Sequence, residues 1–589
     1  MRSEEGTDRS RTLFAVLAVT ALALAVRLVG LGTRVFHWDE GRVGYWILRY
    51  HESGQFSYRP IVHGPFLFIT NDYVFSVLPP SDFSARLVVA LVGGLLPLSA
   101  WLLRDRLRGV EIVALAAVLA ANPLLVYYSR FMRNDVLVGA FAFVALALFV
   151  RAVDAGKGWL VLPSAASLAL AFTAKENALI YVVCFLGAGF LLLDHRLFRA
   201  ARSGRSVRTV VRDDWRLALA YRLQRWGGSV GGGVARTAAT ALGSAVVFFA
   251  VVVFFYAPRP DLWTALANPA ALPGVVEAAT LGTWDEFWTL WVEGAHQSHD
   301  YLPFLYDYLE TLAYGAPVVL AFAVVGVVAD GYLDDYRELV AFAAYWGAVS
   351  ALGYPIATDI RAPWAAVHAV VPLAVPAAVG LAFLYRQSRP ILASEGSVGS
   401  RLRDVSSPRS RRAVVASVLL LSAAVGAAGA NAVYMNSASD DTEQVLQWAQ
   451  PENDLKETLG RVRVVAQANE DGPDVLFYGT TTPSGDSVRF YVENESSLRQ
   501  PPPGGPAWHT RLPLPWYLER YGATVTSTPP REGNLSSDPP PVIVAYSWNR
   551  TDVAEQVSGY SAHAHDFRLW SDRVVVFVDE SELAAARAE

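Results

Sequence analysis

The residues best placed to do chemistry are two adjacent carboxylates, Asp39 and Glu40, in the sequence His37-Trp38-Asp39-Glu40-Gly41-Arg42. They follow the first long apolar run, residues 13–31, which is about as long as the ~20 residues that an α-helix needs to cross hydrocarbon. A charge at the edge of a membrane is costly when it loses water without gaining a partner. The pair is therefore either a solvated loop or is held by a metal ion, an arginine or a substrate.

Other polar clusters follow later apolar runs, on the face of the membrane predicted to carry Asp39. The segments Tyr127–Asp135, Thr173–Asn177 and Thr358–Trp364 contain cations together with carboxylates. Arginine offers paired planar donors to phosphate and lysine a compact charge, so these segments predict a phosphate site. Singly, such cations also contact lipid headgroups and such histidines serve structure, and the joint placement favours a site. The predicted substrate-binding residues are Arg42, His63, Arg130, Arg133, Asp135, Lys175, Glu176, Arg361 and His368.

A metal site has less support in the sequence. His296, His299 and Asp39 are the candidate ligands for a divalent cation such as Mg²⁺ or Mn²⁺, but the i, i+3 spacing of the two histidines indicates only a shared helix face. The single cysteine, Cys184, lies in a predicted span and excludes a cysteine-based metal site or an internal disulfide. The sequence therefore requires no cofactor and leaves open weak assistance by a divalent cation, Mg²⁺ or Mn²⁺.

Composition identifies a membrane protein. Hydrophobic residues make up 53% of the 589 residues and charged residues 17%, as in a polytopic chain. The net charge of −5 and the lack of a Walker loop or a dinucleotide motif argue against nucleic-acid binding and against a nucleotide-driven pump. About eleven transmembrane helices are predicted, over residues 13–31, 84–103, 110–127, 135–152, 160–173, 177–193, 237–257, 312–329, 338–354, 365–385 and 413–432.

Loop charge predicts the orientation of these spans. Residues 194–236 contain ten arginines and three aspartates, whereas residues 258–311 contain one arginine and eight acids. Because basic loops stay in the cytoplasm, the N-terminus is predicted to be cytoplasmic and the loop 32–83, with the other polar clusters, to face outward in the cell membrane. The first run also has features of a secretory signal, but it continues past any cleavage site and the carboxylate pair follows directly.

The chain is predicted to divide into a transmembrane domain, 1–432, and a soluble extracytoplasmic α/β domain, 433–589. The second part has 12 basic and 23 acidic residues and all three Asn-x-Ser/Thr sequons, at Asn494, Asn534 and Asn549. Its turn-rich segments separate short strand-like and helix-like stretches. The predicted strands are Arg461–Ala466, Asp474–Tyr478, Val542–Tyr546 and Arg573–Val578, and the predicted helices are Thr442–Gln450, Pro515–Tyr521 and Val553–Tyr560.

These residues resemble the GT-C glycosyltransferases, membrane enzymes that use polyprenyl-phosphate sugars, and among them the protein O-mannosyltransferase-like branch. In that branch an Asp-Glu pair after the first span is followed by a His-Pro-Pro-Leu-like segment, and here Asp39-Glu40 is followed by Val62–Leu67, with Gly64 replacing one proline. Over nearly its full length the chain is similar to an archaeal set of such proteins associated with lipid-linked-oligosaccharide flipping in N-glycosylation. The motifs that carry this similarity are His37–Glu40, Tyr128–Asp135, Ala174–Asn177, Ala362–Trp364 with His368, and Leu514–Leu518.

The resemblance implies a GT-C fold, a dolichyl-phosphate-type donor, Asp39 as general base, and arginines of the second outer loop near the donor phosphate. The expected function is transfer of a hexose from a polyprenyl phosphate to a protein or glycolipid acceptor on the outer face. Glu40 then orients the site or holds a cation, although the sequence leaves open which of the two carboxylates is the base. The alternatives are a translocator or accessory factor for lipid-linked sugars, and a scaffold that binds glycosylation machinery through its outer domain.

Overall fold

The computed structural model describes residues 2–60, 63–294, 299–333, 336–358, 360–392, 408–437, 445–446, 450–495, 507–530, 534–567 and 573–588. Internal contacts divide the chain into two compact units. The first unit comprises Met1–Val29, Ser57–Leu67 and Leu87–Met435, and the second comprises Gly30–Phe56, Phe68–Arg86 and Asn436–Glu589. Two pieces of the predicted first outer loop thus group with the C-terminal part of the chain.

The first unit is helical. Its long apolar helices are joined by short helices and turns, and α3 (Phe66–Phe75) and α4 (Asp82–Leu95) contribute residues to both units. The helices of the first unit are α1 (Arg2–Leu28), α5 (Gly109–Ala121), α6 (Pro123–Tyr128), α7 (Asp135–Ala155), α8 (Val161–Ala174), α9 (Ala178–Arg202), α10 (Val207–Thr209), α11 (Arg216–Gly227), α12 (Val230–Tyr256), α13 (Asp261–Ala267), α14 (Leu272–Glu277), α15 (Thr283–Phe287), α16 (Tyr301–Gly315), α17 (Pro317–Val328), α18 (Glu338–Ala357), α19 (Val367–Leu392) and α21 (Pro408–Tyr434).

The prediction of a polytopic helical membrane fold is confirmed. Within the described ranges, eight helices are long and apolar enough to cross a membrane, and the bent pair of α16 and α17 makes a ninth candidate. The two remaining predicted spans correspond to the shorter apolar helices Gly109–Ala121 and Gly158–Ala174. Eight to nine spans are therefore shown where the sequence predicts eleven.

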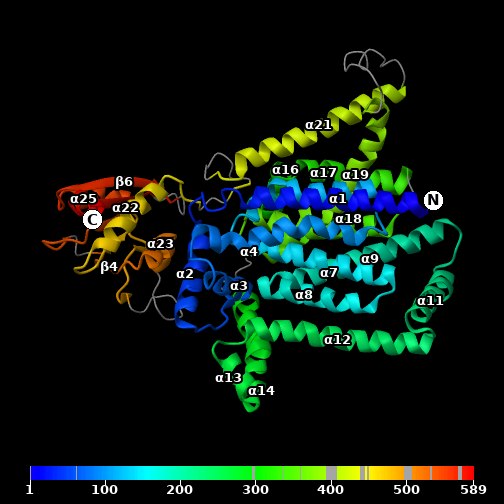
Figure 1. Ribbon diagram of the computed structural model, residues 1–589, viewed down its shortest axis with the longest axis horizontal. Coiled ribbons are helices and arrows are strands. Elements are labelled where there is room, and N and C mark those ends of the chain that lie inside the picture. The colour runs from blue at the N-terminus through cyan, green and yellow to red at the C-terminus, as the bar shows by residue number, and fades with distance from the viewer. Residues whose placement is uncertain are drawn as a thin grey trace. The chain divides into compact units, whose positions relative to one another are not determined.

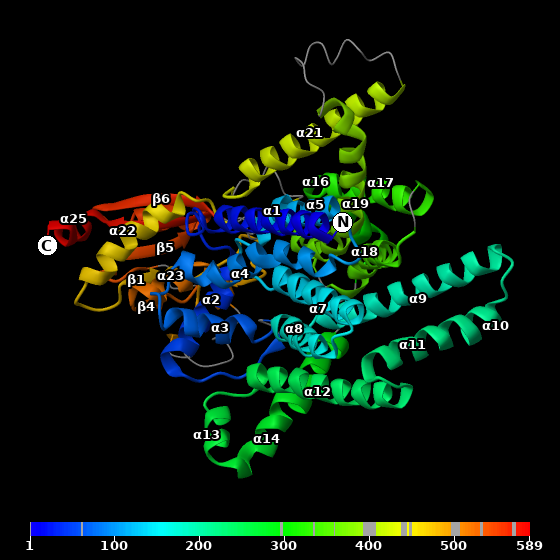
Figure 2. The same cartoon turned by 45° about the vertical axis from the view of Figure 1, so that its right-hand side comes forward.

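The interior of the first unit forms around α19, which packs against α5, α7, α17, α18 and α21. Its sequence is rich in alanine and valine, and small side chains allow neighbouring helices to approach closely. The helices α7 and α8 form an antiparallel pair, while α21 is inclined to α1 in both views (Figures 1 and 2). The end of this bundle where α7 begins carries most of the polar residues considered below.

The second unit contains a five-stranded mixed sheet in the order β4-β1-β5-β7-β6. The central strand β5 is buried on both faces, since the helices α22 and α24 both pack against it. In this unit α2 and α23 lie side by side (Figure 1). The elements of the second unit are α2 (Trp38–Ser53), α22 (Leu455–Ala468), β1 (Val475–Phe477), β2 (Thr480–Thr481), β3 (Val488–Arg489), α23 (Leu514–Tyr521), β4 (Val525–Ser527), β5 (Val542–Tyr546), α24 (Arg550–Ala554), β6 (Tyr560–Asp566), β7 (Arg573–Asp579) and α25 (Glu580–Ala588).

The structure corrects two element assignments in this unit. Arg461–Ala466, predicted as a strand, lies inside helix α22, because the buried residues Leu455, Leu459 and Val462 recur at helical rather than alternating spacing. The helix predicted over 553–560 ends at Ala554, and β6 begins at Tyr560. The strands predicted at 474–478, 542–546 and 573–578 and the helix at 515–521 are confirmed, whereas most of 442–450 lies outside the described residues.

Candidate functional site

The carboxylate pair lies at the N-terminal end of α2, in the second unit. His37 precedes the helix, and its Nδ1 accepts a hydrogen bond from the Asp39 N–H at 2.9 Å. In return, Glu40 Oε2 accepts from the His37 N–H at 3.0 Å, which completes a capping box with histidine in the position usually taken by Ser or Thr. The local sequence therefore fixes where the helix starts and places both carboxylates in its first turn.

Glu40 is fully buried and is paired with Arg86. Arg86 Nε donates to Oε1 at 2.7 Å and the second guanidinium nitrogen to Oε2 at 2.6 Å, a two-pronged geometry that strengthens an ion pair. The same guanidinium donates to the backbone oxygens of Leu31, Arg34 and Val35. Through Arg86, Glu40 thus holds the backbone of residues 31–35 beside the start of α2.

Asp39 has a different environment. Its side chain is 21% exposed, and Oδ2 lies 3.7 Å from Nδ1 of His37. Arg42, one turn further along α2, lies over the ring of Trp38 with its guanidinium carbon 5.6 Å from the ring centre. Of the two adjacent carboxylates, Asp39 is the one that a solute can reach.

A second group of predicted site residues meets around Asp135, at the start of α7 in the first unit. The buried carboxylate lies 3.0 Å from Nζ of Lys175, 3.3 Å from Nε of Arg133 and 3.2 Å from Nε2 of His368. The guanidinium carbon of Arg133 lies 3.3 Å from the centre of the Trp364 ring. With two cations to one carboxylate, this cluster carries surplus positive charge.

His368 is held on several sides in this cluster. The hydroxyl of Tyr181 lies 2.7 Å from Nδ1, and the ring of Tyr354 stacks on the imidazole at 4.3 Å between centres. The amide of Asn177 lies 3.2 Å from Nε2. These contacts fix the plane of the imidazole beside Asp135 and Lys175.

His63 reaches the same cluster from the segment that precedes α3. Its Nε2 lies 3.5 Å from a guanidinium nitrogen of Arg133, and its backbone has φ 70°, a left-handed conformation that is rare for a residue with a side chain. The next residue is Gly64, where a Cβ would lie 2.3 Å from the backbone oxygen of Thr173. Glycine at this position therefore permits the close approach that brings His63 to Arg133.

Glu176 lies next to Lys175 in the chain and lines an apolar cavity of about 220 Å³. Its carboxyl accepts a hydrogen bond from the Tyr58 hydroxyl at 2.6 Å, and the cavity continues between apolar side chains such as Phe172, Phe248 and Val252. Burial raises the pKa of Glu176 to about 6, although the bond from Tyr58 opposes the shift. An apolar cavity thus has one carboxyl in its lining, and the next residue back in the chain is Lys175.

Two predicted phosphate-binding residues have other partners. Arg130 is buried, and one of its nitrogens donates to the backbone oxygens of Val26, Arg27 and Val29 at the end of α1. Arg361 is 52% exposed and is paired with Asp307 at 2.5 Å. Arg130 thus holds the end of α1, and Arg361 forms an ion pair at the surface.

The residues do not fit a resident divalent cation. Glu40, the neighbour of Asp39, is bound in both oxygens by Arg86. His299 lies 2.7 Å from the backbone oxygen of Pro355, and His296 falls outside the described residues. No group of three or more His, Cys, Asp or Glu side chains suited to a metal ion occurs in the ranges that the structure covers.

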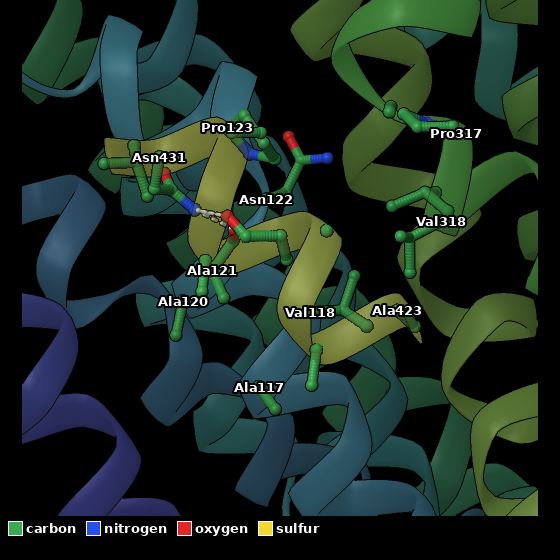
Figure 3. A pocket seen from close by; sticks show the side chains of 18 of the residues that line it. Ala117, Val118, Ala120, Ala121, Asn122, Pro123, Pro317, Val318, Ala423 and Asn431 are labelled. Carbon is green, nitrogen blue, oxygen red and sulfur yellow. Dashed lines mark hydrogen bonds between the residues drawn. The ribbon is translucent and has the colours of Figure 1, made fainter. Parts of the chain in front are cut away.

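A larger cavity of about 670 Å³ lies elsewhere in the first unit, between α1, α5, α17 and α21. Figure 3 shows its walls of alanine, valine and proline, with the Asn431 amide donating to the backbone oxygen of Ala121. No charged side chain lines it. It offers apolar volume without a group that would hold a phosphate.

The sequence did not single out Arg86, Tyr58, Tyr181 or Tyr354 as site residues. Arg86 had a usable signal, because an arginine at the start of an apolar run needs a partner, and the nearest candidate was the Asp39-Glu40 pair. The tyrosines gave none, since aromatic residues at span ends are common in any membrane protein. Their role became visible only from their positions beside Glu176 and His368.

Two segments of the chain match known protein families. Residues 62–204 match the family model described as dolichyl-phosphate-mannose-protein mannosyltransferase, and residues 455–579 match that of the Agl23 flippase-associated protein C-terminal domain. The chain therefore contains a segment similar to the mannosyltransferase family and, in its C-terminal part, a segment similar to the Agl23 domain. Arg133, Asp135 and Lys175 lie inside the first match, whereas Asp39 precedes it. No curated protein matches the chain.

Solved structures agree with this fold. The apo form of ArnT from Cupriavidus metallidurans aligns with a TM-score of 0.53 at 17% identity, over 96% of this chain and 98% of that one. The same protein bound to undecaprenyl phosphate gives a TM-score of 0.50, with the same identity and coverage. The archaeal oligosaccharyltransferase AglB from Archaeoglobus fulgidus, in complex with an inhibitory peptide and a dolichol-phosphate, gives 0.48 at 13% identity, over 97% and 74% of the two chains. At 17% identity the likeness to ArnT concerns the fold.

Proposed function

We propose that this protein is a glycosyltransferase that moves a hexose from a polyprenyl phosphate to a hydroxyl acceptor, a protein or a lipid-linked glycan, on the outer face of the membrane. The observation that carries the proposal is the surplus positive charge of Arg133 and Lys175 around Asp135, next to the apolar cavity that Glu176 lines. The apolar lining of this small cavity suits a short part of an isoprenoid chain, and the two cations suit its phosphate. The bound undecaprenyl phosphate of ArnT, a protein of the same fold, supports this choice of donor.

The reaction is a single displacement. The acceptor oxygen bonds to the anomeric carbon while the bond from that carbon to the phosphate oxygen breaks, so the configuration inverts. Asp39 takes the proton of the acceptor hydroxyl, because it is the exposed member of the pair and Glu40 is bound by Arg86. The electron pair leaves with the polyprenyl phosphate, and Lys175 and Arg133 stabilise its charge.

The test is transfer of radiolabelled mannose or glucose from a polyprenyl phosphate to membrane acceptors by the purified full chain in liposomes. Asp39→Asn is expected to lower turnover by ~10²–10⁴-fold while donor binding persists. The matched control is Glu52→Gln in the same helix, whose exposed carboxylate contacts Arg49 and lies far along α2 from Asp39. Equal turnover in wild type and Asp39→Asn would contradict the assignment.

The match of residues 455–579 favours a second candidate, participation in the flipping of a lipid-linked sugar without transfer. In that case the wild type would bind polyprenyl phosphate and release no transferred label. Movement of a labelled lipid-linked sugar across the liposome membrane then becomes the informative measurement. Dependence of that movement on Lys175 would support this candidate over the enzyme.

A further inference from the structure

The second unit contains a buried carboxylate that the proposed reaction does not use. Asp82, the first residue of α4, accepts hydrogen bonds from Nε1 of Trp516 at 3.0 Å and from the hydroxyl of Tyr517 at 3.1 Å. A guanidinium nitrogen of Arg520 lies at 3.1 Å and Nζ of Lys456 at 2.8 Å. Four side chains from α22 and α23 thus converge on one carboxylate of the first outer loop.

The Tyr517 hydroxyl also reaches the residue that precedes the α2 cap. It accepts a hydrogen bond from the backbone N–H of Phe36 at 2.8 Å and donates its own hydrogen to Asp82. Burial raises the pKa of Tyr517 well above its ordinary value, so the hydroxyl keeps the hydrogen that this bond requires. The rings of Phe36 and Trp516 stack with centres 4.6 Å apart. A continuous chain of bonds therefore runs from Asp82 through Tyr517 to the peptide next to His37.

Further contacts hold the entry segment, defined here as residues 31–37, against C-terminal residues. The Val35 N–H donates to Asn453 at 3.1 Å, and the Val35 oxygen accepts from Gln450 at 3.0 Å. Within α2, a Cβ on Gly44 would lie 2.7 Å from the ring of Trp516. Both the backbone before α2 and one face of α2 are therefore fitted closely to the C-terminal domain.

We propose that the C-terminal domain positions the candidate base: Tyr517, held by Asp82, sets the start of α2 and with it the place of Asp39. This inference rests on the proposed function for its catalytic consequence, and on the contacts alone for its structural part. Tyr517 and Asp82 are positioning residues, since they act on Asp39 through the backbone of residues 36 and 37. A misplacement of about 1 Å in a reacting group is enough to cost ~10²-fold in rate.

The variant that tests this is Tyr517→Phe in the full chain, which removes one oxygen and keeps the ring. Hydrogen–deuterium exchange of residues 36–44 is measured in lipid nanodiscs, and kcat and the KM for donor are measured in liposomes. Exchange at 36–44 is expected to rise about 3–10-fold, because one buried hydrogen bond is worth ~0.5–1.5 kcal/mol. The kcat is expected to fall about 3–30-fold and KM to stay within about twofold, since the donor contacts of Lys175 are untouched.

Tyr521→Phe, one turn along α23, is the matched control and is expected to change neither quantity. Gly44→Ala disturbs the packing of α2 on Trp516 and is also expected to raise exchange at 36–44. This second variant tests the inference if Tyr517→Phe has a small effect. Unchanged exchange at 36–44 in both variants would overturn the proposal. Raised exchange with unchanged kcat would overturn its catalytic part. If the wild type transfers no sugar, the proposed function fails, while the exchange measurement still decides whether α23 holds the entry segment.

Discussion

Each unit buries one of the predicted site carboxylates, Glu40 or Asp135, and the cations around the two are arranged differently. In the second unit, both oxygens of Glu40 are bound by Arg86, whose remaining donors are taken by backbone oxygens, and Arg34 lies 4.0 Å from the same carboxylate. In the first unit, Asp135 faces Lys175, Arg133 and an imidazole, so positive charge exceeds negative. Two-pronged binding by one guanidinium suits a structural carboxylate, whereas two cations from separate segments around one carboxylate suit the binding of a further anion. The comparison therefore assigns architecture to Glu40 and anion binding to the Asp135 cluster.

The largest expected effect comes from breaking the buried pair of Glu40 and Arg86. Glu40→Gln leaves the guanidinium of Arg86 buried without its counter-charge and also weakens the α2 cap. Removing one partner of a buried ion pair typically costs about 3–5 kcal/mol, so the free energy of unfolding is expected to fall by that amount. Thermal unfolding of the purified protein in detergent measures the loss.

Glu52→Gln in the same helix is the control for this change. The carboxylate of Glu52 is largely exposed, and its partner Arg49 keeps a second contact with Glu519. The free energy of unfolding is therefore expected to change by less than about 1 kcal/mol. If Glu40→Gln were as stable as Glu52→Gln, the charge of Glu40 would not support the structure. The division of roles between Glu40 and Asp39 would then fail.

The second prediction tests the surplus charge of the Asp135 cluster. Lys175→Met keeps a similar side-chain length and removes the ammonium group, leaving Arg133 to balance Asp135. A charge-assisted bond to a phosphate is worth about 1.5–3 kcal/mol, so the Kd for polyprenyl phosphate is expected to rise about 10–100-fold. Lys157→Met, on the exposed turn between α7 and α8, is expected to leave the Kd unchanged. Equal affinity of Lys175→Met and wild type in a binding titration would show that the phosphate site lies elsewhere.

How far the sequence predicts these two regions depends on whether the partners are close in the chain. Asp39 and Glu40 were identifiable because they follow an apolar run, and the end of α2 nearest them is determined by the local His37-x-x-Glu40 pattern. The helical membrane fold was also predictable, since length and hydropathy act locally. By contrast, the partner of Glu40 is 46 residues away, and the sequence provides only the presence of a lone arginine in an apolar run.

The Asp135 cluster also shows that sequence does not predict contacts between residues far apart in the chain. Residue types suggested Arg133, Asp135, Lys175 and His368 as candidates, and the structure brings these four side chains together. Arg130 has the same type and nearly the same position in the chain, yet it caps α1. Arginines three residues apart point to different neighbours, and only packing decides which of them meets Asp135. Sequence alone therefore predicts the cluster but not its membership.

The third prediction concerns Glu176, which lies beside the cationic cluster and has a raised pKa. Because the folded chain binds this proton with a pKa of about 6, above the ordinary value of 4.5, the charged form disfavours folding above pH 6. That cost, about 2 kcal/mol, is expected to disappear as the pH falls toward 4.5. Glu176→Gln should accordingly be more stable than wild type at pH 8 and similar to it near pH 4. Thermal unfolding across this range measures the difference, with the exposed Glu277→Gln as control, and a difference independent of pH would contradict the shift.

The smallest effect is expected at Arg361. This arginine was predicted for the same phosphate site as Arg133, but its partner Asp307 is exposed. Its pair with Asp307 is open to water, and such pairs contribute about 0–1 kcal/mol. Arg361→Ala is therefore expected to change the free energy of unfolding by less than about 1 kcal/mol and the Kd for polyprenyl phosphate by less than about twofold. A tenfold weaker Kd would mean that Arg361 leaves Asp307 to meet the phosphate. In that event an exposed arginine would bind the donor, and the burial of Lys175 and Arg133 beside Asp135 would not identify the donor-binding cations.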